Sequence, residues 1–184
     1  EDPRFREEHA TESLWRPYDF IFDVGPGVYF LEPYDARKIP VLFVHGINGT
    51  PMNFRFLIEH LDRTKYQPWL YYYPSGVRLA SLADHLDQTM KTLQLQHGFT
   101  QYYVIAHSMG GLVSRGFLLR NQLGGSRARV PLYITISTPW AGHKAAQAGV
   151  DYAPTVVYVW NDMVPRSAYL TDLFFTNSDG EPVH

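Results

Sequence analysis

The sequence of 184 residues contains no cysteine. This absence excludes disulfide bonds, thiol nucleophiles and metal sites built on thiolates. It leaves the cellular compartment open, because exported and cytoplasmic proteins can both lack cysteine. The chain starts at Glu1 rather than at methionine, so a cleaved targeting segment would not be visible. We therefore favour, slightly, an exported bacterial protein (periplasmic, lipid-anchored or secreted) over a cytoplasmic one.

Strong net charge and long apolar runs are also missing. The 16 basic and 18 acidic residues give a formal net charge of −2, and the basic residues are scattered. We therefore expect neither a nucleic-acid partner nor an acidic substrate. No stretch approaches the roughly 20 apolar residues of a membrane span, so no integral membrane segment is expected. With 45% hydrophobic residues, the chain can bury one sizeable core, which predicts a single domain over residues 1–184.

One serine stands between a β-favouring run and a helical pattern, in the stretch YYVIAHSMGGLVSR at residues 102–115. The residues two positions to either side of Ser108 are small, namely Ala106 and Gly110. A strained strand-to-helix turn leaves no room for bulky side chains at those positions. The following helix also aims its first amides at the reacting centre. The pattern predicts a nucleophile elbow with Ser108 at its apex.

A second motif lies upstream, in IPVLFVHGINGT at residues 39–50, where a buried strand ends in His45-Gly46. One amide from such a loop joins the amide of the residue after the nucleophile to bind an oxyanion. The expected donors are therefore Ile47 and Met109. Gly46 keeps the loop free of a side chain near the substrate oxygen. We expect His45 to support its loop by hydrogen bonding rather than to act as a base.

Three segments resemble the α/β-hydrolase superfamily, and within it the lipase and serine-esterase branch: residues 41–54, 104–115 and 136–143. The elbow reads AHSMG, with alanine in place of the usual first glycine. By this resemblance His107 and Gly110 would support the elbow. The resemblance implies a three-layer α/β/α sandwich with a mostly parallel sheet. It also implies a serine hydrolase that acts on a small-molecule ester or lipid through an acyl-enzyme, without metal or organic cofactor.

Taken in order, the chain alternates strand and helix patterns, which is typical of a parallel sheet covered on both faces. Residues 1–17 are charged or lack apolar periodicity and are expected to form an extended lead-in. Further expectations are an antiparallel hairpin over 20–22 and 28–31, strands over 41–44, 69–73 and 102–105, a helix over 79–96, a buried strand over 130–137, a short helix over 167–174, a turn at 177–180 and a strand starting at 181.

A serine hydroxyl needs a histidine base and usually an acid that orients it. In the resembled family both follow the serine in the chain. His143 comes too early for the family's last-loop histidine, and His184 is the final residue. The acids available are Asp151, Asp162, Asp172, Asp179 and Glu181. Asp162, between an apolar run and Val-Pro, is the best candidate. We expect that the chain is C-terminally incomplete and that the true acid and base lie beyond it.

Two aromatic positions at the ends of strands are candidates for an acyl pocket, Trp140 and Tyr73, with Tyr72 as an alternative to the latter. The other interpretation makes them core or rim aromatics. Two further functions stay open with the same fold. One is a non-catalytic module that binds a lipid, glycan or protein partner, and the other is an acyltransferase that uses Ser108. The sequence does not indicate an oligomeric state.

Overall fold

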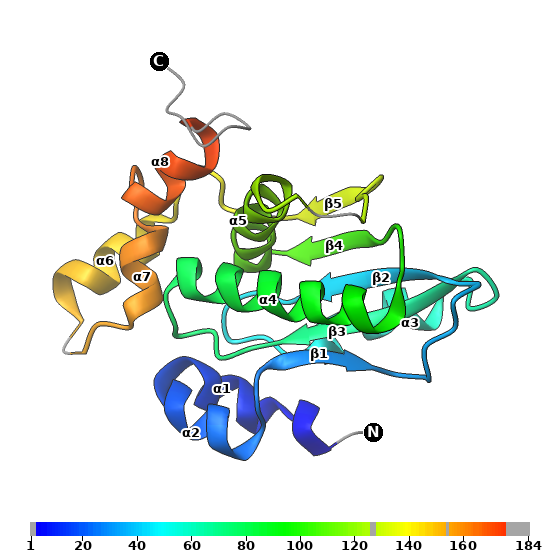
Figure 1. Ribbon diagram of the computed structural model, residues 1–184. Helices are drawn as coiled ribbons and strands as arrows, with labels where there is room; N and C mark the ends of the chain where they lie inside the picture. The colour runs from blue at the N-terminus through cyan, green and yellow to red at the C-terminus, as the bar shows by residue number, and fades with distance from the viewer. Residues whose placement is uncertain (1–2, 126–127, 154, 176–184) are drawn as a thin grey trace.

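Five strands form one mixed sheet at the centre of the computed structural model, which describes residues 3–125, 128–153 and 155–175 (Figure 1). Their order across the sheet is β1-β3-β2-β4-β5. Strand β1 runs antiparallel to β3, whereas β3, β2, β4 and β5 are parallel. The bounds are β1 (Gly27–Phe30), β2 (Ile39–Val44), β3 (Tyr66–Tyr72), β4 (Tyr103–His107) and β5 (Tyr133–Ile136).

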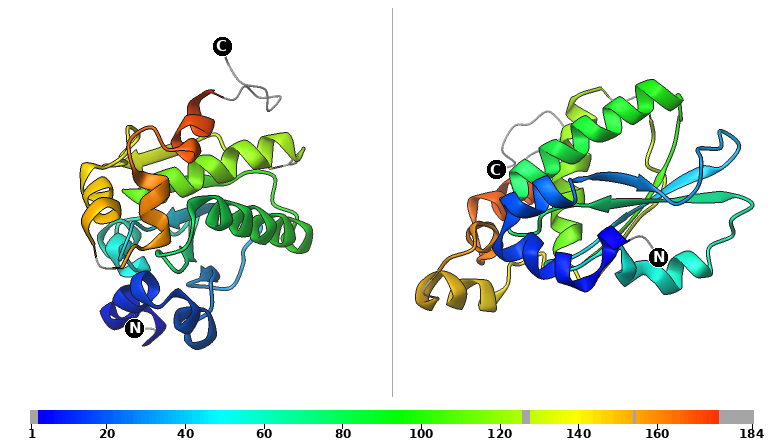
Figure 2. Two further views of the ribbon diagram at one scale, coloured as in Figure 1. Left: turned by 90° about the vertical axis from the view of Figure 1, so that its left-hand side faces the viewer. Right: turned by 90° about the horizontal axis from the view of Figure 1, so that it is seen from below.

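Helices cover both faces of this sheet, as the right-hand view of Figure 2 shows. On one face lie α4 (Leu79–His97) and α5 (Met109–Leu123). The other face is covered by η1 (Pro3–Phe5), α2 (Pro17–Asp23), η2 (Pro51–Phe54) and α3 (Arg55–Glu59). The predicted three-layer α/β/α sandwich with a mostly parallel sheet is confirmed.

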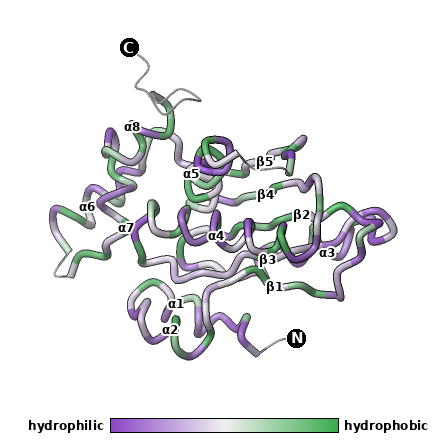
Figure 3. Tube along the Cα trace, in the orientation of Figure 1, coloured by the Kyte–Doolittle hydropathy of each residue, from purple (hydrophilic) through white to green (hydrophobic). Residues whose placement is uncertain are grey.

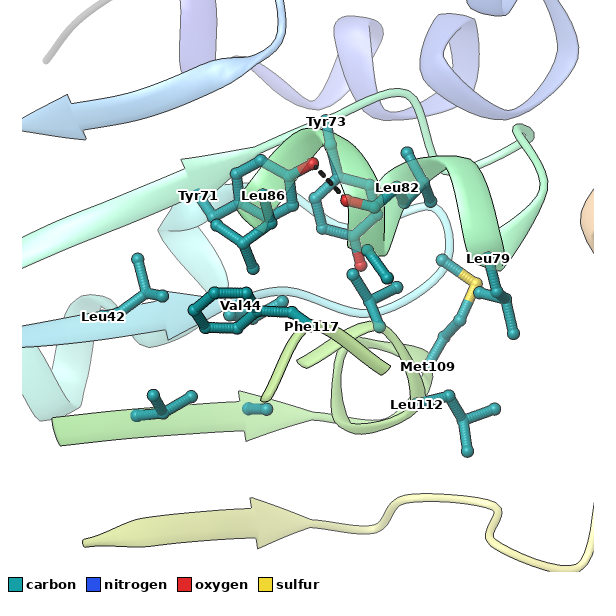
Figure 4. Packing of buried hydrophobic residues seen from close by; sticks show 14 of the residues in the cluster. Leu42, Val44, Tyr71, Tyr73, Leu79, Leu82, Leu86, Met109, Leu112 and Phe117 are labelled. Carbon is teal, nitrogen blue, oxygen red and sulfur yellow. Dashed lines mark hydrogen bonds between the residues drawn. The ribbon is translucent and has the colours of Figure 1, made fainter. Parts of the chain in front are cut away.

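Helix α4 shows how the sequence produces this packing. Its apolar residues recur at helical spacing and face the sheet, and the alternation with hydrophilic residues is visible in Figure 3. Leu79, Leu82 and Leu86 are buried in the core shown in Figure 4, where the Tyr71 hydroxyl donates to the Leu82 carbonyl at 3.1 Å. The helix ends at Gly98, whose φ of +69° is left-handed.

Three short helices lie beyond the carboxyl ends of the parallel strands (Figure 1): α6 (Lys144–Tyr152), α7 (Tyr158–Met163) and α8 (Ala168–Phe175). The last confirms the short helix expected over 167–174. The turn and strand expected from residue 177 lie outside the described residues. None of the described helices combines the length and hydrophobicity that crossing a bilayer requires.

The antiparallel strand predicted over 28–31 is confirmed by β1, but the two predictions before it were wrong. Instead of an extended lead-in, the chain forms η1 and α1 (Glu7–Trp15), and residues 20–22 belong to α2 rather than to a hairpin strand. The run Phe20, Ile21, Phe22 resembles a strand, but only Phe20 is fully buried, edge-on against Tyr72 at 4.8 Å, while Phe22 is 84% exposed. A helix needs to bury only one residue in each turn, and Phe20 meets that need. Pro17 also favours a helix, because proline is well tolerated in the first helical turn.

The buried strand predicted over 130–137 also needs correction. Strand β5 covers Tyr133–Ile136 and pairs with β4 alone among the described strands. Ile134 and Ile136 are each 39% exposed. An apolar run reports a preference for burial, but it does not say whether a neighbouring element covers it.

Candidate active site

Ser108 stands at the bend between β4 and α5. Its φ of +51° and ψ of −126° lie in a region that residues with a Cβ rarely adopt and that costs roughly 1–3 kcal/mol. Two backbone hydrogen bonds hold the bend: the Ser108 amide donates to the Ile136 carbonyl at 2.8 Å, and the Gly111 amide donates to the Ser108 carbonyl at 3.0 Å. The surrounding structure therefore imposes the strained backbone, and the serine stays partly exposed.

Gly110 lets α5 pack directly on the end of β2. A Cβ at this position would lie 2.3 Å from the carbonyl oxygens of both Val44 and His45. Ala106, on the other side of the serine, has no exposed surface. The small residues on both sides of Ser108 thus lie where a larger side chain would collide with neighbouring atoms.

The loop after β2 lies against the serine. A Cβ on Gly46 would come within 2.9 Å of the Ser108 Cβ and within 3.3 Å of the His107 carbonyl oxygen. Only a glycine fits this contact without displacing the elbow. The structure thereby brings together Gly46, His107 and Ser108, which the sequence placed in two separate motifs.

The two predicted oxyanion amides lie on these two elements. The Gly46 carbonyl accepts from His45 Nδ1 at 2.8 Å and from the Gly49 amide at 3.2 Å. Because the peptide is planar and trans, the Ile47 N–H points opposite to that carbonyl. Met109 is the first residue of α5, so its amide has no acceptor within the helix. Within the described part of the chain, neither amide donates to a protein acceptor.

His45 is fully buried, and its ring stacks on Tyr73 at 4.1 Å. Its Nδ1 faces the Gly46 carbonyl and therefore carries the proton, while Nε2 accepts from the Tyr73 amide at 3.4 Å. Burial, which disfavours the charged ring, lowers the pKa of His45 to about 4. A neutral imidazole with both nitrogens engaged orients the loop and is not available as a base.

The two predicted pocket aromatics differ. Tyr73 has no exposed surface, and its hydroxyl donates to the His45 carbonyl. In this structure it is therefore a core residue, which favours the second interpretation of the sequence for this position. Tyr72 is equally buried. Trp140 is partly exposed and packs edge-on against Phe174 at 5.7 Å, so its pocket role stays a prediction.

Asp162, the preferred acid of the sequence, has a structural role. Its carboxylate is 3% exposed and accepts from the Leu79 amide at 2.7 Å and from Arg78 Nε at 3.0 Å, with a second Arg78 contact at 2.6 Å. These bonds satisfy an amide in the first turn of α4 that has no partner within the helix. None of the described partners of this carboxylate is a histidine.

Two of the remaining partner candidates, His143 and Asp151, are hydrogen-bonded to groups other than the serine. His143 caps α6, where its Nδ1 accepts from the Ala145 amide at 3.1 Å. The exposed Asp151 accepts from Gln147 at 2.9 Å. His184, Asp179 and Glu181 lie outside the described residues. Within the described residues, the structure therefore assembles an elbow and two free amides, without a base bonded to Ser108.

Sequence reasoning missed two serines beside this site. Ser75 Oγ accepts from the Asn48 amide at 3.0 Å and lies 3.0 Å from Ser13 Oγ. Both serines have no exposed surface. In the sequence, Ser75 stands between a proline and a glycine after the strand expected over 69–73, and Ser13 lies in the expected lead-in. A buried serine pair 62 residues apart leaves no signal in a single sequence.

Comparison with protein families gives one match, to the family described as the alpha/beta hydrolase fold, over residues 39–175. The chain belongs to this family. Strands β2 to β5, the elbow and the loop after β2 all lie within the matched residues of this α/β hydrolase. Helices α1 and α2 lie before them. A search of curated protein sequences finds no match.

Solved structures agree on the fold. The mature form of the lipase BlEst2 from Bacillus licheniformis is 16% identical, with a TM-score of 0.61 over 78% of this chain and 62% of that one. Phospholipase PlaB from Legionella pneumophila is 19% identical, with a TM-score of 0.56 over 76% of this chain and 34% of that one. A structure from work on carboxylesterases of Nitrososphaera gargenis is 20% identical, with a TM-score of 0.50 over 66% and 46%. This α/β hydrolase thus spans 62% or less of these chains.

Proposed function

We propose that this α/β hydrolase is a serine hydrolase of carboxylic esters. Ser108 Oγ attacks the ester carbonyl carbon, the alcohol leaves, and water then hydrolyses the acyl-enzyme. The Ile47 and Met109 amides bind the oxyanion that forms in both steps. Each such donor contributes about 10²- to 10³-fold to the rate in known acyl-transfer enzymes.

The observation that carries the proposal is the backbone strain at Ser108, with φ at +51°, directly beside a glycine loop. A strained bend is retained only where the structure around it enforces it, and such bends cluster at functional sites. Here it presents a partly exposed hydroxyl at the positive end of the α5 dipole. The partly exposed hydroxyl on this bend can reach a substrate carbonyl. The helix dipole stabilises the negative charge that develops on the serine oxygen and on the oxyanion.

The reaction also requires a base for the Ser108 proton and, later, an acid for the leaving alcohol. His45 is locked in its loop, and His143 caps α6. We therefore infer that the base and its orienting acid come from parts of the protein outside the described residues. In their absence, the oxyanion hole and substrate binding alone would give a small share of the full rate.

An ester or lipid is the substrate class that fits best. Similar folds include a lipase and a phospholipase by name, and both classes cleave esters. Trp140, at the carboxyl edge of the sheet, is our candidate for the wall of the acyl pocket. The chemistry requires neither metal nor organic cofactor, because the nucleophile and the charge-stabilising amides all belong to the protein.

The test uses the full-length natural protein, a fluorophosphonate probe and p-nitrophenyl butyrate. We expect the probe to label Ser108, and Ser108→Ala to lose both labelling and ester hydrolysis. Ser81→Ala, which changes an exposed serine on α4, is the matched control and should behave like the wild type. A Ser108→Ala protein that hydrolyses the ester at the parental rate would contradict the proposal.

One observation favours a second candidate, a non-catalytic module that binds a lipid or another partner in the same place. Among the described residues, no histidine is hydrogen-bonded to Ser108. If the full-length protein neither reacts with fluorophosphonate nor hydrolyses esters of two to twelve carbons, while retaining its fold by circular dichroism, this second function replaces the first.

A further inference from the structure

The loop that carries Ile47 is held from two sides. From within, the Gly46 carbonyl is fixed by His45 and Gly49, which orients the peptide before Ile47. From outside, the Asn48 amide donates to Ser75 Oγ at 3.0 Å, which orients the peptide after Ile47. Because both flanking peptides are planar, these contacts together fix the backbone of the oxyanion loop at Ile47.

The outside contact continues into α1 as a chain of buried hydroxyl groups. Ser13 Oγ donates its single proton to the Ala10 carbonyl at 2.7 Å. Ser13 can therefore only accept from Ser75, 3.0 Å away, so the Ser75 proton points to Ser13. Ser75 then accepts from the Asn48 amide. The direction runs without conflict from Asn48 through Ser75 and Ser13 to Ala10, and each bond polarises the next.

Backbone contacts hold the same junction. The Gly76 amide donates to the Ser13 carbonyl at 2.9 Å, and a Cβ on Gly76 would lie 2.1 Å from the Leu14 carbonyl oxygen. Helix α1 thus rests directly on the turn that carries Ser75. Asn48 itself has a φ of +52°, a conformation that costs energy and needs support from its surroundings.

We propose that Ser75 is a positioning residue for the oxyanion loop, and that through Ser13 it makes helix α1 part of the catalytic framework. Helix α1 lies before residue 39, where the family match begins, so this support is added to the shared fold. The catalytic consequence rests on the proposed function of Ile47. The structural coupling from α1 to Asn48 does not, and the two can be tested separately.

The first test measures amide hydrogen exchange by NMR in the ¹⁵N-labelled protein. Asn48 is an exposed residue, but its amide is hydrogen-bonded to the buried Ser75 and should exchange slowly. Ser75→Ala should accelerate this exchange about tenfold or more. Ser13→Ala removes the acceptor of the Ser75 hydroxyl and should accelerate exchange of the Asn48 amide by about threefold. The double variant should match Ser75→Ala, because both changes act through one chain of bonds. Amides of Leu42 and Val104 in the central strands report global stability, so the acceleration at Asn48 is counted only where it exceeds theirs.

Two further variants isolate the role of α1. Gly76→Ala keeps both hydroxyls but pushes the Leu14 carbonyl away, and it should also accelerate Asn48 exchange. Thr89→Val removes a hydroxyl that bonds only within α4, to the His85 carbonyl at 2.8 Å, and should leave Asn48 exchange unchanged. Unchanged exchange in both Ser75→Ala and Gly76→Ala, or equal acceleration in Thr89→Val, would overturn the proposal.

The second test measures ester hydrolysis and fluorophosphonate labelling in the full-length protein. Ser75→Ala should lower kcat by about tenfold, less than the 10²- to 10³-fold loss of a whole donor, with KM nearly unchanged. A fall in Asn48 protection with kcat unaltered would overturn the catalytic part of the proposal. A wild type that reacts with neither reagent would instead overturn the proposed function, and the exchange results would still decide the coupling.

Discussion

Two parts of the molecule follow different rules. The elbow region, residues 44–50 and 106–111, is tightly packed and held by backbone hydrogen bonds. Backbone atoms of its loop and of helix α5 are in direct contact. The C-terminal region, residues 132–153 and 155–175, begins with a half-exposed edge strand and continues in short helices. The motifs predicted the first region well because packing leaves it few alternatives. In the second region, the same kind of reading misassigned the burial of β5 and did not foresee the contacts of Asp162 with Arg78 and Leu79.

The largest effect should come from the glycine of the elbow region at which a new Cβ would meet backbone atoms most closely. Gly110→Ala would place a Cβ 2.3 Å from the carbonyl oxygens of Val44, at the end of β2, and of His45, just after it, which only a shift of α5 or of this backbone could relieve. We expect a loss of about 3 kcal/mol or more in the free energy of unfolding, measured with urea.

The matched control is Gly124→Ala at the other end of α5. Its φ is −78°, and the nearest atoms are Nζ at the end of the long Lys91 side chain, at 2.9 Å, and the Arg120 carbonyl oxygen, at 3.2 Å. We expect a change within about 0.5 kcal/mol. Equal effects of the two alanines would mean that the elbow region is no more tightly packed than the periphery.

A pH effect comes next, from His45. Burial lowers its pKa to about 4 from 6.5, so between these values the unfolded chain binds a proton that the folded chain does not. Stability therefore falls as pH falls through this window, by about 3 kcal/mol for this residue. His45→Asn keeps a donor for the Gly46 carbonyl but does not titrate there.

Urea unfolding at pH 7 and at pH 4 tests this linkage. The stability gap between the wild type and His45→Asn should narrow by about 3 kcal/mol from the higher to the lower pH. A gap that stays constant for His45→Asn would show that the buried ring does not resist protonation.

In the C-terminal region, Asp162 separates a structural role from a catalytic one. Asp162→Asn weakens the contacts to Arg78 and the Leu79 amide, and we expect a loss of about 2 kcal/mol in stability. The rate of fluorophosphonate labelling at Ser108 should stay within twofold of the wild type, about the scatter of such a comparison. A hundredfold slower labelling with unchanged stability would restore Asp162 as the catalytic acid.

The sequence predicts the layers, the strained bend at Ser108 and the glycine loop beside it because each depends on local patterns: a β-favouring run, small residues at fixed offsets and a helical stripe. It misses what depends on distant partners. Asp162 looks like an acid until Leu79 and Arg78, more than 80 residues away, are seen to bind it. Ser13 and Ser75 are ordinary until the fold brings them together. For α2, the run Phe20 to Phe22 fits a strand or a helix, and packing against β3 decides.

The smallest effect should come from the edge strand itself. Ile134→Thr removes apolar surface from a residue that is 39% exposed, so little transfer free energy is lost and the new hydroxyl can reach water. We expect a change within about 0.5 kcal/mol. Val104→Thr, on the neighbouring β4, swaps a buried methyl for a hydroxyl at almost constant volume and should cost about 2 kcal/mol. If Ile134→Thr costs as much as Val104→Thr, then in solution β5 is covered as completely as β4, and the contrast between the two regions disappears.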